Sequence, residues 1–322
     1  MPKATPVTRN DVAQYAGVST AVVSYVVNEG PRPVAPETRD RVLEAIRVLG
    51  YRPNATARAL RLGTTRTFGL ITPDGGNPLF AELAKAIDKE AAARGYVVLQ
   101  TGADGDPATE QSKIAELLIR RVSGLLLVAP TEDPDLSETD IPVIAINRVL
   151  STVSSVRPQY REGARRGVEH LLEHGHRRVG LVIGGGRSGE RELGWRDALR
   201  AAGLEDGPIA RTTFSRQGGY DAGHELLAAT NRPTAVFASS DLQAVGVLRA
   251  IHEAGLRIPD DIAVLAFDGT AETEYSWPPL SVVRQPLEQM AREAVSRLID
   301  GQDAVEAVTY PTDLILRRSC GC

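Results

Sequence analysis

From Thr67 onwards, short apolar runs alternate with helical patterns, and this alternation constrains the fold more than any other feature. Runs such as GLLLVA and AVLAF contain no polar residue, which is typical of parallel strands that helices cover on both faces. Strands are expected at 68–72, 97–101, 124–129, 143–147, 179–183, 210–214, 234–238 and 262–267. Helices are expected at 79–94, 108–121, 161–174, 190–202, 218–229 and 241–254. The sequence therefore predicts an α/β fold of two Rossmann-like lobes, with a crevice at the carboxyl ends of the strands.

After these alternating units, the chain is expected to return once more to each lobe. A helix at 287–300 returns to the first lobe, and the segment 308–317 returns to the second. On this interpretation the first lobe comprises about 67–158 and 286–304, and the second comprises about 159–285 and 305–322.

A different pattern precedes the lobes, and it predicts three short helices within residues 1–50. Thr8 can cap the first helix with Asp11 at the capping-box position, Gly17 ends it, and Ser19 caps the second. The third begins near Pro36 and stops at Gly50. Val23, Val26 and Val27 are expected to point inward, and Thr20, Ala21, Ser24 and Tyr25 to face outward. Three such helices with a glycine turn match a helix-turn-helix DNA reader.

The charge of the chain is unevenly distributed. Residues 1–62 contain nine basic and five acidic residues, a net charge of +4, so the remainder carries −8 of the total of −4. A basic head on an acidic body favours contact of the head with a polyanion. The first ten residues have no apolar signal-peptide core, and no apolar run approaches the length of a membrane span, so we expect a cytoplasmic protein without a membrane partner.

Three segments, DVAQYAGVSTAVVSYVVN, ETRDRVLEAIRVLGYRPNATARAL and TFGLITPDGGNPLFAEL, closely resemble the lactose-repressor (LacI/GalR) family of bacterial transcription regulators. The resemblance extends over essentially the whole chain and implies the two-lobed architecture shared with periplasmic binding proteins. It also implies that the second helix lies in the major groove, where Thr20, Ala21 and Tyr25 read bases. Residues expected to bind phosphates are Thr8, Ser19, Ser24 and Asn28.

Two residues depart from the family pattern in this head. Ala21 can offer only an apolar contact, for example to a thymine methyl group. Val22 stands where relatives often have a hydroxyl that contacts phosphate.

The segment 51–66 resembles the family's hinge helix and linker, which enter the minor groove. Asn54 can cap this helix, and its alanines keep it slim. So short a helix is expected to form only against DNA and a second subunit. Leu60 is expected to act as a wedge between base steps. The hinge residues expected to contact DNA are Asn54, Ala57, Arg58 and Leu60.

The resemblance further implies a small-molecule effector, a sugar or related metabolite, bound in the crevice. Arg191 would hold a ligand oxygen, Asp268 would accept hydrogens from ligand hydroxyls or amines, and Phe214 would stack on a sugar or base face. The expected ligand-binding residues are Asn77, Phe80, Asn147, Arg187, Arg191, Phe214, Asp241, Asp268 and Trp277. Asn147 replaces an Asp that relatives often have, and Ser240 replaces an Asn, which blurs the identity of the ligand.

Other motifs point to cofactors or metals, and we expect neither. The run GGGRSG at 184–189 fits a dinucleotide fingerprint, but the acid that should end the next strand, Glu205, precedes that strand. The histidines His170, His174 and His176 are interpreted as a helix end that runs into a strand rather than as a metal site. Two cysteines, Cys320 and Cys322, cannot complete a zinc site, and a bridge between them would close too tight a ring, so we expect them reduced and incidental.

Together these features predict a ligand-responsive, sequence-specific DNA-binding regulator, a repressor that acts as a homodimer on a palindromic operator. An alternative is a cytoplasmic sugar-binding protein whose head has lost operator function, which Ala21 and Val22 would favour. An enzyme built on the same lobes ranks third, because the sequence supports no catalytic arrangement, and the prediction is that the protein is not an enzyme.

Overall fold

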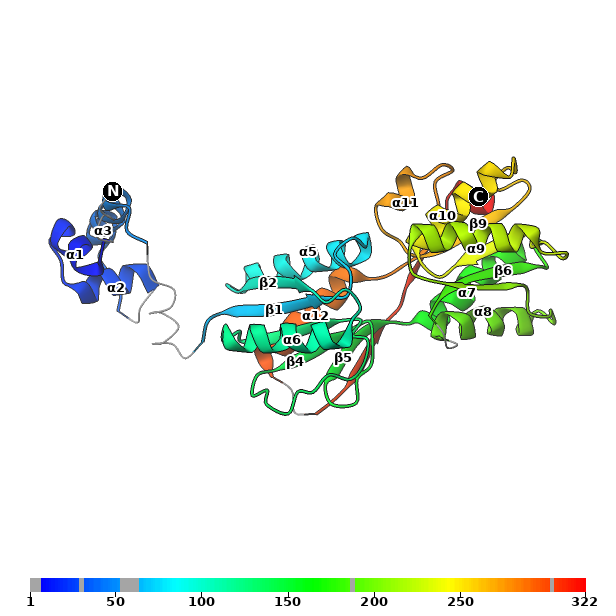
Figure 1. Cartoon of the computed structure of the whole chain (residues 1–322). Coiled ribbons are helices and arrows are strands. Elements are labelled where there is room, and N and C mark those ends of the chain that lie inside the picture. Colours follow the sequence, from blue (N-terminus) through cyan, green and yellow to red (C-terminus); the bar gives the residue numbers. More distant parts are fainter. Residues whose placement is uncertain (1–6, 29–31, 53–63, 186–188, 302–303) are drawn as a thin grey trace, which may run out of the picture. The chain divides into compact units, whose positions relative to one another are not determined.

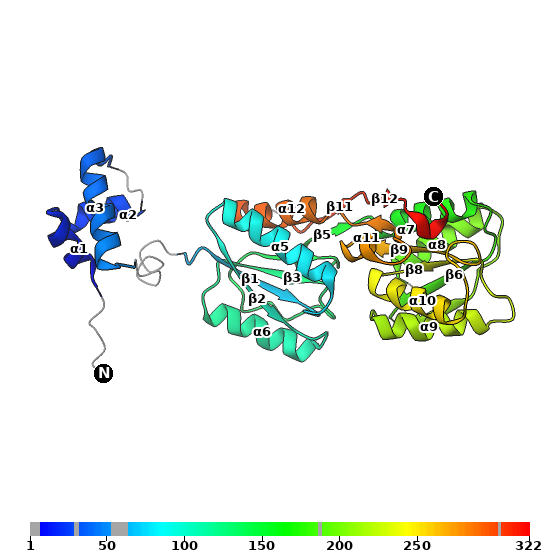
Figure 2. The ribbon, with the colours of Figure 1, turned by 90° about the horizontal axis from the view of Figure 1, so that it is seen from above.

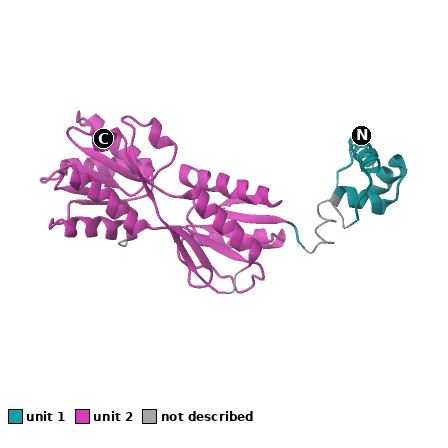
Figure 3. Ribbon diagram, turned by 180° about the vertical axis from the view of Figure 1, so that it is seen from behind, with its two compact units in different colours: residues 1–65 teal, residues 66–322 magenta. Residues whose placement is uncertain are grey.

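The computed structural model describes residues 7–28, 32–52, 64–185, 189–301 and 304–322. The chain divides into two compact units, residues 1–65 and 66–322 (Figure 3). Among the helices of the described residues, none combines the length and the apolar character that crossing a membrane requires.

The first unit is a bundle of three helices: α1 (Arg9–Ala16), α2 (Thr20–Asn28) and α3 (Pro36–Leu49). The Thr8 hydroxyl caps α1 by accepting from the Asp11 backbone N–H, while the Asp11 carboxylate accepts from the Thr8 N–H at 2.7 Å. Gly17 ends α1 with φ 64°, a left-handed conformation that glycine adopts without steric cost. The predicted capping box and turn are both present.

The core of this unit is small and built mainly from valine and alanine, with Val12, Val23, Val26 and Val42 buried. Ser24 corrects one expectation, because it is buried rather than outward-facing. In a helix of only nine residues packed against two neighbours, a small side chain beside the inner valine stripe is covered as well. Thr20 and Ala21 are exposed, and Tyr25 is half-buried.

The second unit contains two sheets of six strands, each the centre of one lobe (Figure 1). The first sheet has the order β11-β5-β4-β3-β1-β2, and all of its pairings are parallel. Its strands are β1 (Thr67–Thr72), β2 (Val97–Gly102), β3 (Gly124–Val128), β4 (Val143–Ile146), β5 (Ser154–Pro158) and β11 (Ala307–Tyr310). Helices α5 (Pro78–Ala93) and α12 (Leu287–Asp300) cover one face, and α6 (Pro107–Ile119) covers the other (Figure 2).

The second sheet has the order β12-β10-β9-β8-β6-β7, with β12 antiparallel to β10 and the other pairs parallel. Its strands are β6 (Val179–Gly184), β7 (Ile209–Thr212), β8 (Ala235–Ala238), β9 (Ala263–Asp268), β10 (Ser281–Arg284) and β12 (Asp313–Ile315). The main helices are α7 (Tyr160–Glu173), α8 (Glu190–Ala201), α9 (Arg216–Ala228) and α10 (Asp241–Glu253). The first two pack on one face and the last two on the other, and buried residues alternate between the two cores along each strand. The short helices α11 (Glu272–Tyr275) and η1 (Arg318–Cys320) complete this lobe.

The expected return of 308–317 to the second lobe is wrong in part. Residues 307–310 form β11 in the first sheet, and only 313–315 join the second. Pro311 lies between the two strands and has no N–H to donate, so the chain leaves one ladder there and crosses to the other lobe. The boundary placed at 305 is therefore too early.

The sequence patterns also missed β5 and β10. Each is a four- or five-residue strand with serine at its start, and β5 ends on a proline, so neither shows an apolar run. Both precede a passage of the chain between the lobes, at 158–160 and at 284–287.

Candidate functional site

A cavity of 1440 Å³ lies between the two lobes of the second unit, at the carboxyl ends of their strands. Both lobes contribute side chains to its wall, among them Asn77, Phe80 and Asn147 from the first and Arg191, Phe214 and Asp268 from the second. Six of the nine ligand-binding residues expected from the sequence are therefore brought together. The volume exceeds the 300–1,000 Å³ or so of an ordinary small-molecule pocket.

Asp268 is the last residue of β9 and the most buried acid of the cavity wall, with 3% of its surface exposed. Its Oδ1 accepts from Gln285 Nε2 at 2.7 Å and from Arg191 Nη2 at 3.3 Å. Its backbone has φ 122°, where a non-glycine residue is strained. Burial raises the pKa of this carboxyl to about 6, although Arg191 and Gln285 both favour the charged form.

Arg191 stands in the first turn of α8, and aromatic rings fix its guanidinium. The centre of that group lies 4.3 Å from the ring centroid of Tyr160 and 4.6 Å from that of Phe267. Its Nε is buried and makes no hydrogen bond within the described residues. A planar donor held in one orientation, with a buried N–H still to be paired, is suited to bind an oxygen of a ligand.

Asp241 does not line the cavity, contrary to expectation. It begins α10, and its Oδ2 accepts from the Thr270 backbone N–H at 2.7 Å and from the Thr270 hydroxyl at 2.8 Å. These bonds hold the turn that follows Asp268. Burial, with the nearby charge of Asp268 as the next cause, raises the pKa of Asp241 well above its usual range. Asp241 therefore positions the turn after β9 rather than reaching the cavity.

The first-lobe wall contributes two of the expected amide side chains, Asn77 and Asn147. Asn77 caps α5 by accepting from the Leu79 N–H at 3.0 Å, so its oxygen is already in use. Asn147 follows β4 with φ 66°, and its Oδ1 is buried without a partner among the described residues. That oxygen is an acceptor of the first-lobe wall that is available to a ligand.

The remaining expected residues differ in position. Phe214 is 44% exposed and lies over Gly184, where an added Cβ would come within 2.3 Å of the ring, so glycine is needed for this close approach. Trp277 is 83% exposed and is not part of the cavity wall. Arg187 lies outside the described residues.

Sequence reasoning missed three further groups at this site. Tyr160 supports Arg191, and Gln285 fixes Asp268. Arg157 lines the cavity, and its buried Nε has no hydrogen-bond partner in the described part of the chain. All three lie in or beside the segments that pass between the lobes. The proximity of those segments to the crevice could have indicated them.

In the N-terminal unit, the residues expected to contact DNA differ in exposure and in whether their side chains are already hydrogen-bonded. Thr20 and Ala21 are exposed on α2, whereas the Thr8 hydroxyl is bonded to Asp11 and the Ser19 hydroxyl accepts from the Val22 N–H at 3.3 Å. The side chain of Asn28 lies outside the described residues, as do the hinge residues Asn54, Ala57, Arg58 and Leu60.

Comparison with known proteins agrees with both units. Residues 8–54 match the model of bacterial regulatory proteins of the lacI family, and residues 168–320 match a periplasmic binding protein-like domain. An HTH-type transcriptional repressor PurR of Erwinia tasmaniensis is 34% identical over 331 residues, which covers 97% of this chain and 96% of that protein. The chain belongs to the lacI family of bacterial regulatory proteins.

Solved structures show the same relationship for this lacI-family protein. A Lac repressor dimer bound to operator and the anti-inducer ONPF has a TM-score of 0.87 and 29% identity, covering 98% of this chain and 99% of that chain. The transcriptional regulator CelR in complex with cellobiose has a TM-score of 0.73 and 30% identity, with 97% and 99% covered. The family identifies the chain as a ligand-responsive, DNA-binding transcriptional repressor with a helix-turn-helix unit and periplasmic-binding-protein-like lobes.

Proposed function

We propose that this lacI-family repressor binds its effector between the lobes through Asp268 and Arg191, and that the effector sets the affinity of a homodimer for a palindromic operator. The observation that carries the proposal is the buried Asp268–Arg191 pair at the wall of a 1440 Å³ cavity. Burying such an ion pair costs desolvation free energy, which a ligand that binds to the pair can offset. Because operator DNA is cytoplasmic in bacteria, we place the protein there.

The chemistry of the wall favours a polyhydroxylated effector, a sugar or related metabolite. Asp268 accepts hydrogens, the Arg191 guanidinium donates them, and together they match a ligand that presents a hydroxyl beside an oxygen acceptor. Phe214, with 44% of its surface exposed, offers an apolar face for stacking. On the other side, Asn147 supplies a neutral acceptor, which avoids placing a second charge against Asp268.

The link to DNA would be a change in the separation of the lobes. The cavity is larger than a single small ligand needs, and the chain passes between the lobes at 158–160, 284–287 and 310–313. A ligand that contacts both walls stabilises the arrangement in which they are closer. By linkage, that arrangement changes operator affinity if the two lobe arrangements present the N-terminal units differently to DNA.

Two measurements test this proposal on the full chain. Thermal shift with a panel of mono- and disaccharides, cellobiose included, and of nucleobases should reveal a compound that raises the melting temperature with increasing concentration. Fluorescence anisotropy on a palindromic duplex should then show that the same compound changes operator affinity.

Matched variants of α8 locate the site. Arg191→Ala should abolish the ligand-induced thermal shift, while Arg200→Ala, on the same helix with its side chain 78% exposed, should keep it. Neither should alter operator binding without ligand. Unchanged ligand affinity in Arg191→Ala would contradict the site. Ligand binding without any preference for the palindrome would instead favour a sugar-binding protein that has lost operator function.

A further inference from the structure

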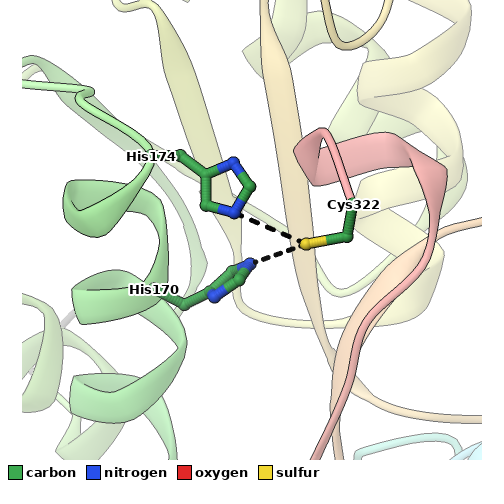
Figure 4. A group of neighbouring side chains, drawn as sticks. All are labelled: His170, His174 and Cys322. Carbon is green, nitrogen blue, oxygen red and sulfur yellow. Dashed lines mark hydrogen bonds between the residues drawn. The ribbon is translucent and has the colours of Figure 1, made fainter.

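Two histidines and two cysteines that are far apart in the sequence meet on one side of the second lobe. His170 lies in the last turn of α7, and His174 is the residue that ends this helix, one turn later. Cys320 is the last residue of η1, and Cys322 follows the next glycine. Figure 4 shows the two imidazole rings and the Cys322 thiol pointing toward a common point.

The distances among the donors of His170, His174 and Cys322 are those of ligands around one small ion, and Cys320 lies beside this group. The Cys322 Sγ lies 3.4 Å from His170 Nε2 and 3.4 Å from His174 Nε2, and Cys320 Sγ is also 3.4 Å from His170 Nε2. Metal bonds of about 2.3 Å to sulfur and about 2.0–2.1 Å to nitrogen, at tetrahedral angles, place N and S about 3.5 Å apart. Among the described residues, His170, His174 and Cys322 form the cluster in which all three ligand atoms lie within 4.8 Å of one another.

The local backbone is arranged to bring both thiols to the helix. Gly321 has φ 96°, a left-handed conformation, and its N–H bonds to the Arg318 carbonyl at 3.2 Å. This turn places Cys322 back beside Cys320. Cys320 is 1% exposed, and its sulfur accepts a hydrogen bond from the Ser281 hydroxyl at 3.0 Å. Its sulfur is therefore held in one position, as a metal ligand requires.

A carboxylate stands near the outer nitrogen of His170, at a distance from which it could move to hydrogen-bond. Glu173 Oε2 lies 4.0 Å from His170 Nδ1, the ring nitrogen that faces away from the thiols. In zinc sites the second ring nitrogen of a ligating histidine usually donates to a carboxylate, and Glu173 would need to approach His170 by about 1 Å to accept that bond.

We propose that His170, His174 and Cys322 bind one Zn²⁺ ion with the neighbouring Cys320 as the fourth ligand, and that the ion ties the end of α7 to the turn that follows η1. Two imidazoles and two thiolates are borderline-soft donors in a tetrahedral set, the combination that selects zinc among abundant divalent metals. Four protein ligands leave no open position, so the role is structural rather than catalytic. The cysteines, which alone could not complete a zinc site, complete one with histidines that lie about 150 residues earlier in the chain.

His176 supplies a control from the same segment. Its Nδ1 lies 3.0 Å from the Thr234 hydroxyl, so this histidine is directed to a different partner and does not belong to the cluster. It was grouped with His170 and His174 by spacing alone, and the structure separates it from them.

The test uses the full chain, expressed without a histidine tag, fully reduced and stripped of metal. One equivalent of Co²⁺ should give the visible bands of a tetrahedral site together with thiolate-to-cobalt charge transfer, and Zn²⁺ should displace both signals. Zinc should also raise the melting temperature, and a chelator should reverse that shift.

Variants at the exposed ligands identify the site without threatening the fold. Cys322→Ser and His174→Gln should each weaken zinc binding by more than about 100-fold, the upper range for loss of an outer-shell contact alone. Cys322→Ser should reduce the charge transfer, and His176→Gln should leave spectrum and affinity unchanged.

Three results would overturn the proposal: no tetrahedral cobalt spectrum in the reduced protein, equal binding by Cys322→Ser and the unchanged chain, or equal loss in His176→Gln. A Cys320–Cys322 disulfide in place of metal binding would count in the same way. Effector and operator binding are measured independently of these signals, so failure here does not bear on the proposed function.

Discussion

The buried carboxyl of Asp268 should make the protein less stable as the pH rises, and replacing it with an uncharged amide should abolish this part of the pH dependence. Burial raises its pKa from 3.8 to about 6, which means that the folded protein holds the proton more tightly than the unfolded chain does. The stability that this group contributes is complete below about pH 4 and is lost as the pH rises through about 6.

The size of the effect follows from the shift. Two pKa units correspond to about 3 kcal/mol of unfolding free energy, lost in full above about pH 7. By about pH 5 roughly half is already lost, because the unfolded carboxyl is then ionised while the folded one is not. Between about pH 5 and pH 8 the unchanged protein should therefore lose about 1–2 kcal/mol that Asp268→Asn keeps. Relief of Asp241, whose pKa Asp268 also raises, acts in the same direction.

Urea unfolding of both proteins at about pH 5 and pH 8 measures this quantity. The difference between variant and parent at one pH includes the altered bonds to Arg191 and Gln285, but the change in that difference with pH isolates the titration. Asp221→Asn, an exposed position on α9, is the control and should show no such change. A pH-independent difference for Asp268→Asn would refute the account of a carboxyl destabilised by burial.

Three further outcomes are expected. Raising the salt concentration should weaken operator binding by the dimer steeply, because residues 1–62 carry a net charge of +4 and phosphate contacts release counterions. Fluorescence anisotropy across a salt series measures this, and tight binding of a monomer to one half-site would contradict it. Leu60→Ala should weaken binding to operator more than to random DNA and should reduce the bend seen by energy transfer, whereas equal weakening would make Leu60 only a linker residue. Gly163→Ala should lower the free energy of unfolding by about 1–3 kcal/mol, because its Cβ would lie 2.5 Å from Thr312 Oγ1 and 2.9 Å from Val283 Cγ1. Gly189→Ala, whose Cβ would meet no described atom within 4 Å, should be neutral, and equal effects of the two variants in urea unfolding would contradict the importance of the packing against Thr312.

Features that depend on neighbours in the sequence could be predicted. The Thr8–Asp11 capping box and the buried runs that became β3 and β9 are formed by interactions within one turn or by uniform burial. Asp268 and Arg191 could also be placed, because a polar residue directly after a buried parallel strand, or at the start of the next helix, faces the crevice in any fold of this class.

Features that depend on packing between distant segments could not be predicted. Ser24 is buried by the neighbouring helices, and Asp241 turns to Thr270 instead of the cavity. The assignment of β11 to the first sheet and β12 to the second depends on which sheet edge is free to pair with the chain before and after Pro311. The approach of Cys322 to His174 joins positions almost 150 residues apart, and no local pattern of either segment contains that information.

The unpaired polar atoms around the cavity connect ligand choice with the response to ligand. Asn147 Oδ1 and Arg157 Nε belong to the first lobe, whereas Arg191 Nε belongs to the second, and none of the three atoms has a partner among the described residues. A buried donor or acceptor without a partner costs about 1–3 kcal/mol. A ligand that pairs atoms of only one lobe recovers part of this cost but favours no particular separation of the lobes. A ligand that pairs atoms of both lobes recovers the full cost only when the walls are close. The resulting difference in binding free energy between the close and the separated arrangement lies in the range of about 1–3 kcal/mol that is typical of coupling between two sites. The strength of the response should therefore depend on how many of these atoms a ligand pairs across the cavity, and much less on the apolar area that it buries.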